Sequence, residues 1–210
     1  MTAIEVLIKY WGHTQFRLKQ EEIIEQIIER RDVLALLPTG GGKSICYQIP
    51  ALMQEGICLV ISPLISLMAD QVRHLQSRGI KSVAITSNMH YSEIDTALTN
   101  CIYGGVKFLY LSPERLKNDL VQNRIKEMNI NLITVDEAHC ISEWGHNFRP
   151  SYRHISKIRS INKEIPMLAL TATATHDVIE DIQKNLLFKK NNLIKSSFIK
   201  ENMSYVVDKV

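Results

Sequence analysis

Three consecutive glycines, followed by a lysine and a serine, are the residues in this sequence best suited to chemistry. They follow an apolar run at 33–37 and open a stretch with helical periodicity. Glycines let the backbone curl so that its N–H groups converge on an anion, and a helix N-terminus adds partial positive charge at the same point. The pattern therefore predicts a phosphate-binding loop. The residues expected to bind a nucleotide there are Thr39, Gly40, Gly41, Gly42, Lys43 and Ser44.

Within this loop, Lys43 is expected to reach the outer phosphates and the Ser44 hydroxyl to ligate Mg²⁺. The general pattern of such loops would place a glycine at position 37, where this chain has Leu37. The departure concerns the first turn of the loop, while the glycines beside the lysine are intact. A glycine-rich turn that binds nothing is the alternative, and the ordered succession of strand, loop and helix argues against it.

A second apolar run, 131–135, ends in two carboxylates followed by Ala138 and His139. Asp136, at the tip of the expected strand, can hold the shell of a bound Mg²⁺. Glu137 can polarise an attacking water as a general base. We expect His139 to connect this turn to a neighbouring segment. Together with the phosphate loop, these residues predict a site that binds and hydrolyses ATP with Mg²⁺.

The elements that must position these residues alternate along the chain. Six short apolar runs have the length and β-branched content of buried parallel strands, and they lie at 33–37, 57–61, 82–85, 107–111, 131–135 and 166–170. Amphipathic segments at 20–30, 43–53, 64–78, 91–102, 114–127, 152–161 and 175–187 read as helices, and 194–198 as a last strand. This alternation predicts an α/β fold, a mostly parallel central sheet with helices on both faces. Ligands of such sheets bind beyond the carboxyl ends of the strands.

The composition is that of an ordinary globular chain. Its 210 residues carry a formal net charge of +3, which is compatible with nucleic acid but weak evidence for it. The four cysteines form no C-x-x-C pair, and His139, Cys140 and His146 lack a fourth ligand for zinc. No apolar run approaches the length of a membrane span, and no signal peptide pattern opens the chain. We expect a cytoplasmic protein without membrane association.

The segment after the acidic pair makes the prediction more specific. Residues 140–150 read CISEWGHNFRP, an aromatic-rich loop that resembles the loop marking the RecQ family of superfamily 2 helicases. Further RecQ-like segments stand in family order along nearly the whole chain: 16–20, 38–48, 62–68, 112–116 and 170–174. The resemblance implies the first, N-terminal RecA-like lobe of an ATP-dependent DNA helicase with a P-loop NTPase fold.

The resemblance also implies roles for individual residues. Gln20 would read the adenine edge, with Arg17 supporting the nucleotide from the same segment. Thr171 and Thr173 would couple hydrolysis to movement, bonded to His139 or to the general base. The residues implied to sense single-stranded DNA and relay its presence to the ATP site are Trp144, His146, Phe148 and Arg149. Aromatic faces can stack on bases and an arginine can pair with phosphate, which gives this loop a physical reason to bind DNA.

Three positions depart from the family pattern. Leu18-Lys19 stands where Pro-Gly is usual, His13 stands where an aromatic ring commonly stacks on the base, and Glu143 stands where glutamine is common. None of them belongs to the phosphate loop or to the acidic pair.

The resemblance covers one lobe, at 1–200, and 201–210 would begin the connection to a second RecA-like lobe that supplies an arginine finger. Without that lobe we expect weak ATP binding and little turnover. The implied partners are single-stranded and partly duplex DNA on the nucleoid, with translocation in the 3′→5′ direction. Two alternatives stay open: a DEAH-type RNA helicase lobe, and a non-catalytic nucleic-acid-binding module that responds to ATP.

Overall fold

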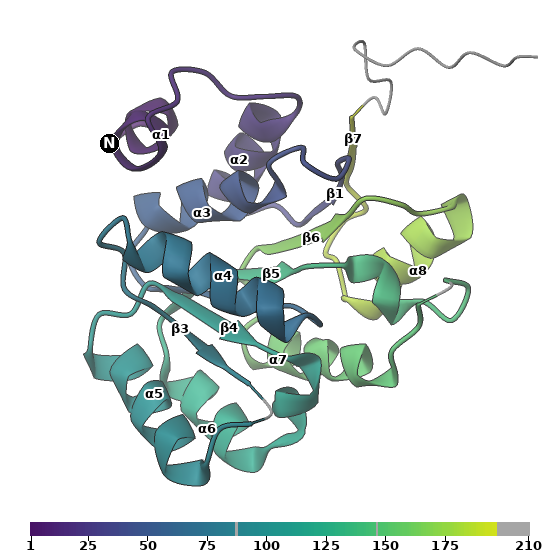
Figure 1. The fold of residues 1–210 in the computed structure, drawn as a ribbon. Coiled ribbons are helices and arrows are strands. Elements are labelled where there is room, and N and C mark those ends of the chain that lie inside the picture. The colour runs from purple at the N-terminus through teal and green to yellow at the C-terminus, as the bar shows by residue number, and fades with distance from the viewer. Residues whose placement is uncertain (87, 146, 197–210) are drawn as a thin grey trace, which may run out of the picture.

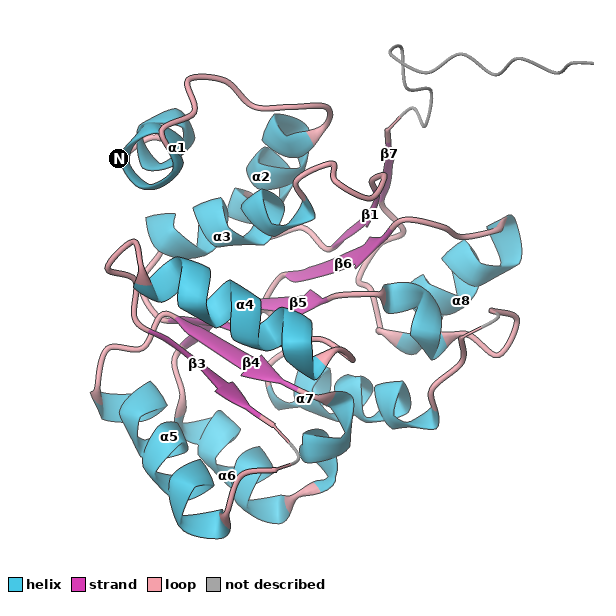
Figure 2. Cartoon of the chain, in the orientation of Figure 1, coloured by secondary structure: helices cyan, strands magenta, loops and turns pink. Residues whose placement is uncertain are grey.

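The protein is built around one parallel sheet. The structure, a computed structural model, describes residues 1–86, 88–145 and 147–196. Within them the sheet has seven strands in the order β3-β4-β2-β5-β6-β1-β7 (Figures 1 and 2). The strands are β1 Val33–Leu36, β2 Ile57–Ile61, β3 Ser82–Ile85, β4 Phe108–Leu111, β5 Ile130–Val135, β6 Met167–Thr171 and β7 Leu193–Lys195. All their pairings are parallel, which confirms the predicted α/β fold class.

Helices cover both faces of this sheet. The α-helices are α1 Ala3–Trp11, α2 Gln20–Ile28, α3 Lys43–Met53, α4 Ile65–Gln76, α5 Tyr91–Tyr103, α6 Asp119–Glu127, α7 Ile155–Ile161 and α8 His176–Asn185. Short 3₁₀ helices are η1 Pro113–Lys117, η2 Ala138–Ile141 and η3 Pro150–His154. Helices α2, α3 and α4 pack on one face, and α5 to α8 pack on the other (Figure 2). Among the described residues, no helix combines the length and apolar character needed to cross a bilayer.

The strands are apolar throughout because both of their faces are buried. In β1, Leu34 and Leu36 belong to the core under α5 to α8, while Val33 and Ala35 belong to the core under α2 to α4. Successive side chains of a strand point to opposite faces, so a sheet between two helical layers requires an uninterrupted apolar run. This is why the strand positions could be read directly from the sequence.

Two predicted helices are interrupted in the structure. The segment expected as one helix at 114–127 is η1 followed by α6, and Asn118 separates them by accepting a hydrogen bond from the Val121 N–H at 3.3 Å with its side chain. The segment expected at 152–161 is likewise η3 followed by α7. The last strand ends at Lys195 where 198 was expected, and residues 197–210, which include the expected inter-lobe connection, lie outside the described residues.

Helix α1 has no counterpart among the predicted elements. Thr2 caps it, and the Glu5 carboxylate accepts from the Thr2 N–H at 2.8 Å to complete a capping box. Val6 and Leu7 are buried against Ile24 of α2 and Ile49 of α3. The pattern of Thr2 followed three residues later by Glu5 could have indicated this helix from the sequence.

The strand order brings the predicted functional segments to one edge. Because every strand is parallel, all carboxyl ends lie on the same side of the sheet. The adjacent strands β2, β5, β6 and β1 end there: Thr171 is the last residue of β6, and the loops after the other three carry Ser62, Asp136 and the phosphate loop at 38–44. The functional segments, far apart in the sequence, therefore meet at this edge.

At the opposite edge, a buried ion pair fastens the amino ends of the strands. Asp32 and Arg159 are each about 1% exposed, with the guanidinium nitrogen 2.6 Å from the Asp32 carboxylate. The same carboxylate accepts from the backbone N–H groups of Met167 at 2.9 Å and Lys189 at 2.8 Å. One carboxylate thus ties together the starts of β1 and β6, helix α7 and the turn before β7.

We predict that Arg159→Met destabilises the protein by about 3 kcal/mol, because it leaves the buried Asp32 carboxylate without its counter-charge. Urea unfolding followed by circular dichroism measures the effect. The matched control is Lys189→Met, which removes an exposed ion pair with Glu164 and should change the free energy of unfolding much less, because water screens that pair. Equal losses in the two variants would show that the buried pair adds nothing beyond a surface one.

Candidate active site

The phosphate loop begins as a continuation of β1. Leu37 is buried, and its N–H donates to the Thr171 carbonyl at 3.1 Å, so the backbone at this position is still part of the sheet. This explains why a leucine can stand where the general pattern has glycine. The bend comes later, at Gly40 and Gly42, whose φ angles of +79° and +72° lie in the region that favours glycine. Gly42 is also the N-cap of α3.

The loop opens onto a cavity of about 360 Å³. Thr39, Lys43 and Ser44 line it from the loop, and Asp136 and Glu137 line it from the end of β5. The structure therefore brings the predicted phosphate-binding residues and the predicted acidic pair to one cavity.

Gln20 lies against the outside of the phosphate loop. Its Nε2 donates to the carbonyls of Gly41 at 3.3 Å and Gly42 at 3.0 Å, and its Oε1 accepts from the Arg17 N–H at 2.9 Å. The side chain is 3% exposed. In this conformation the carboxamide holds the loop backbone, while the Arg17 side chain is exposed. That Gln20 reads an adenine edge stays a prediction.

Asp136 is the most buried carboxylate of the cavity. Its N–H donates to the Ile61 carbonyl at 2.8 Å, and its Oδ2 accepts from the Ser62 hydroxyl at 3.3 Å. Burial raises the pKa of the Asp136 carboxyl, the neighbouring Glu137 raises it further, and Lys43 lowers it. A carboxylate that is costly to ionise gains most from a cation placed beside it. The oxygen donors of Ser44 and Asp136 are the kind that Mg²⁺ prefers, so the residues present fit this ion.

The turn after Asp136 connects the acidic pair to β6. Glu137 adopts φ +48° and ψ +46°, a left-handed conformation that is uncommon for a residue other than glycine. The Nδ1 of His139 lies 3.3 Å from the Glu137 carboxylate and 2.9 Å from the Thr171 hydroxyl. The Thr171 hydroxyl in turn donates to the Thr173 carbonyl at 3.1 Å. A chain of polar contacts therefore runs from Glu137 to Thr173.

The aromatic loop presents its two rings differently. Trp144 is 77% exposed, whereas Phe148 is half-buried and the guanidinium of Arg153 lies 5.4 Å from its ring centre. Arg153 also forms an ion pair with Glu143, the residue that departs from the family pattern. Arg149 is exposed, with one guanidinium nitrogen 3.5 Å from the Pro63 carbonyl. His146, predicted to belong to this site, lies outside the described residues.

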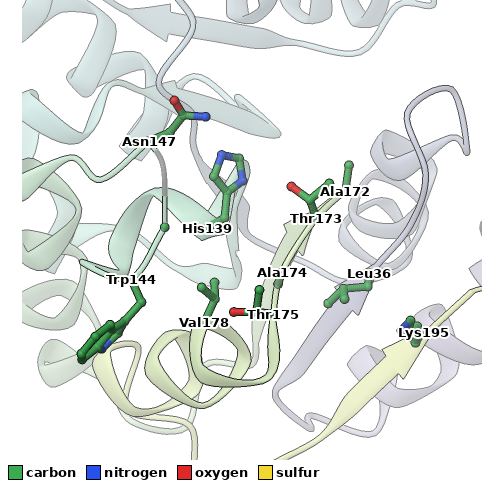
Figure 3. A pocket seen from close by; sticks show the side chains of 11 residues that line it. Leu36, His139, Trp144, Asn147, Ala172, Thr173, Ala174, Thr175, Val178 and Lys195 are labelled. Atoms are coloured by element: carbon green, nitrogen blue, oxygen red, sulfur yellow. The ribbon is translucent and has the colours of Figure 1, made fainter.

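A second cavity, of about 470 Å³, separates the aromatic loop from the segment that follows β6 (Figure 3). Trp144 stands at one rim, Thr173 and Val178 form a wall, and Lys195 lies on the far side (Figure 3). His139 contributes to this wall while its ring also contacts the Glu137 carboxylate. The histidine thus stands between the nucleotide cavity and the aromatic loop.

Two buried tyrosines near the cavity form hydrogen bonds through their hydroxyl groups. Tyr47 is buried, and its hydroxyl lies 3.1 Å from that of Tyr110. Tyr152 carried no predicted role, yet its hydroxyl donates to the Asp136 carbonyl at 2.9 Å. It lay at the start of a predicted helix, and no motif or spacing in the sequence could have linked it to the acidic pair.

Comparison with known proteins identifies the chain. The family model described as DEAD/DEAH box helicase matches residues 17–182. The chain is 45% identical over 209 residues to the ATP-dependent DNA helicase RecQ of Bacillus subtilis (strain 168), covering 99% of this chain and 35% of that protein. It is 46% identical over 188 residues to the probable ATP-dependent DNA helicase RecS of the same organism, covering 89% and 38%.

Solved structures agree on the fold. The helicase domain of Pyrococcus furiosus Hef has a TM-score of 0.67 at 23% identity, covering 93% of this chain and 40% of that one. The DUF1998 helicase MrfA bound to DNA has a TM-score of 0.72 at 15% identity, covering 93% and 29%. At these identities the likeness concerns the fold alone.

The chain belongs to the DEAD/DEAH box helicase family. The more specific resemblance to RecQ helicases is confirmed by relatives of that name at 40–45% identity over nearly the whole chain. The chain spans about one third of the length of these relatives.

We predict that Gly42→Ala weakens nucleotide binding by about tenfold or more. A side chain there costs roughly 1–2 kcal/mol in the left-handed conformation, and its Cβ would overlap the Gln20 Nε2. The free loop would therefore leave the phosphate-binding conformation, and the apparent affinity would fall by about tenfold. Calorimetric titration with a non-hydrolysable ATP analogue and Mg²⁺ measures it. Gly12→Ala is the control, since Gly12 has a similar φ of +71° but no described atom within 4 Å of the added Cβ. Unchanged affinity in Gly42→Ala would contradict the assigned role of the loop.

Proposed function

We propose that this chain is the ATP-binding motor lobe of a RecQ-type DNA helicase. The observation that carries the proposal is the single cavity lined by Lys43 and Ser44 on one side and by Asp136 and Glu137 on the other. Backbone amides of the phosphate loop and Lys43 bind the triphosphate. We assign residues 1–200 to this lobe and 201–210 to the connection with a second one.

Each polar side chain of the cavity has a distinct task. Ser44 and Asp136 would hold Mg²⁺, an ion that supplies charge neutralisation to the phosphates in this class of chemistry. Glu137 orients the attacking water and accepts its proton. His139 lies between Glu137 and Thr171 and holds the general base in a fixed position relative to the end of β6. The raised pKa of Asp136 supports this assignment, because the cation then relieves an unfavourable burial of charge.

The aromatic loop supplies contact with single-stranded DNA and with the single-stranded part of partly duplex substrates. Trp144 offers an exposed ring for base stacking, and Arg149 offers a cation for a phosphate. Thr171 and Thr173 carry the state of the nucleotide site toward this loop through His139. We propose 3′→5′ translocation on the nucleoid, from the RecQ resemblance.

Full activity requires a second RecA-like lobe. In phosphoryl transfer, an arginine supplied from outside the phosphate loop contributes about 10³–10⁵ in rate. Relatives about three times the length of this chain support its presence in the complete protein. We therefore expect the isolated lobe to bind ATP with Mg²⁺ weakly and to turn over very little.

We predict that, in the complete helicase, Glu137→Gln lowers ATP turnover by about 10²–10⁴, because it removes the general base. Nucleotide affinity should stay close to that of the wild type, since the amide keeps the size of the side chain. Phosphate release and calorimetric titration measure the two quantities. Glu127→Gln, at the exposed end of α6, serves as the control and should change neither. A variant that kept wild-type turnover would overturn the assignment of Glu137.

We predict that Trp144→Ala keeps basal ATPase activity but loses its stimulation by DNA. Loss of a stacking ring weakens DNA binding by about tenfold or more, since stacking contributes roughly 1–3 kcal/mol per base. ATPase assays with single-stranded DNA and with RNA of the same sequence measure the effect and test the preference for DNA. Tyr103→Ala, an exposed aromatic on α5, is the control. Full stimulation in Trp144→Ala, or stronger stimulation of the wild type by RNA, would refute this DNA-sensing role.

A further inference from the structure

Tyr152 is a fully buried tyrosine at the edge of the nucleotide cavity. Its ring is 0% exposed, and its hydroxyl donates to the backbone carbonyl of Asp136 at 2.9 Å. This hydrogen bond goes to the backbone of Asp136 and leaves the carboxylate of that residue free for chemistry.

The carbonyl that Tyr152 holds belongs to the peptide group between Asp136 and Glu137. Rotating this peptide group would change the φ of Glu137, which at +48° lies in the left-handed region that L residues rarely adopt. Such a rotation would relieve the backbone and turn the Glu137 carboxylate away from its present place. The Tyr152 hydrogen bond opposes that rotation, because the carbonyl would lose its donor in a buried site.

Tyr152 is also connected to the aromatic loop. It lies in η3, which begins one residue after Arg149, and its N–H donates to the Arg149 carbonyl at 3.0 Å. The Arg149 N–H donates to the Cys140 carbonyl at 2.8 Å, and the Ser151 hydroxyl donates to Glu114 in η1 at 2.9 Å. A displacement of Phe148 or Arg149 therefore reaches Tyr152 through short, hydrogen-bonded backbone.

We propose that Tyr152 is a positioning residue that holds the turn at Glu137 in its left-handed conformation and transmits the state of the aromatic loop to it. This inference rests on the proposed function, since it takes Glu137 as the general base and the aromatic loop as the DNA sensor. The contact between His139 and Thr171 links the acidic pair to β6, whereas Tyr152 links the acidic pair to the segment after the aromatic loop.

The test is Tyr152→Phe in the complete helicase, a change that removes one hydroxyl and keeps the buried ring. We expect the DNA-stimulated kcat to fall about tenfold, as the loss of one positioning hydrogen bond would give. The KM for ATP and the Kd for single-stranded DNA should stay within about twofold of the wild type, because Tyr152 is fully buried and lines neither the nucleotide cavity nor the cavity beside Trp144. Fluorescence anisotropy with labelled DNA and steady-state ATPase assays provide these values.

The matched control is Thr134→Val. Thr134 lies in β5, and this change also removes one buried hydroxyl, but one that does not bond to the Asp136 carbonyl. Thr134→Val should have a melting temperature similar to that of Tyr152→Phe and a kcat near the wild-type value. Ser151→Ala is a second test that leaves the core intact: freeing η3 from Glu114 should lower DNA stimulation about twofold to threefold with KM unchanged.

The results distinguish the positioning role of Tyr152 from the proposed function of the whole lobe. Full DNA stimulation in Tyr152→Phe and in Ser151→Ala, with a stimulated wild type, overturns the positioning role and leaves the proposed function standing. A fall in kcat that Thr134→Val reproduces also overturns it, because general loss of packing would then explain the effect. A complete protein whose ATPase ignores DNA overturns the proposed function and this inference together.

Discussion

The parallel pairing of β5, β6 and β1 is the constraint on which the site depends. Neighbouring strands lie about 5 Å apart, so β1 and β5, separated only by β6, end about 10 Å from each other. That spacing lets Lys43 and Asp136 face one cavity, with Thr171 between them at the tip of β6. The single strand β6 between them thus sets the spacing between the phosphate loop and the acidic pair.

Two aspartates, Asp32 buried and Asp136 half-buried, show how the same residue type serves opposite ends of the sheet. Asp32 has a guanidinium and two backbone N–H groups as partners, and it fastens strands together. Asp136 accepts one long hydrogen bond from Ser62, and burial raises its pKa. The first carboxylate is neutralised by the protein itself. The second has Lys43 near it but forms no ion pair among the described residues, so a further cation would lower the cost of its charge.

The sequence predicted the strands to within one or two residues, apart from the end of β7, because burial on both faces makes each of them an apolar run. The glycines of the phosphate loop and the acidic pair were also readable, since their chemistry depends on neighbours within a few positions. Interruptions such as Asn118 were missed, because a capping residue inside an amphipathic stretch does not disturb its periodicity. Helix α1 was missed even though Thr2 and Glu5 carry its capping signal.

The sequence by itself determined which residues could bind phosphate and metal, and which segments would form strands and helices. The family resemblance led us to expect Thr171 to be bonded to His139 or to Glu137, but only the tertiary structure decided that Gln20 holds the phosphate loop and that Tyr152 reaches the Asp136 carbonyl. These contacts join segments distant along the chain, and they depend on which strands are neighbours and on a left-handed turn. Local propensity and hydrophobic periodicity predict neither the strand order nor this turn, because they describe only residues close together in the sequence.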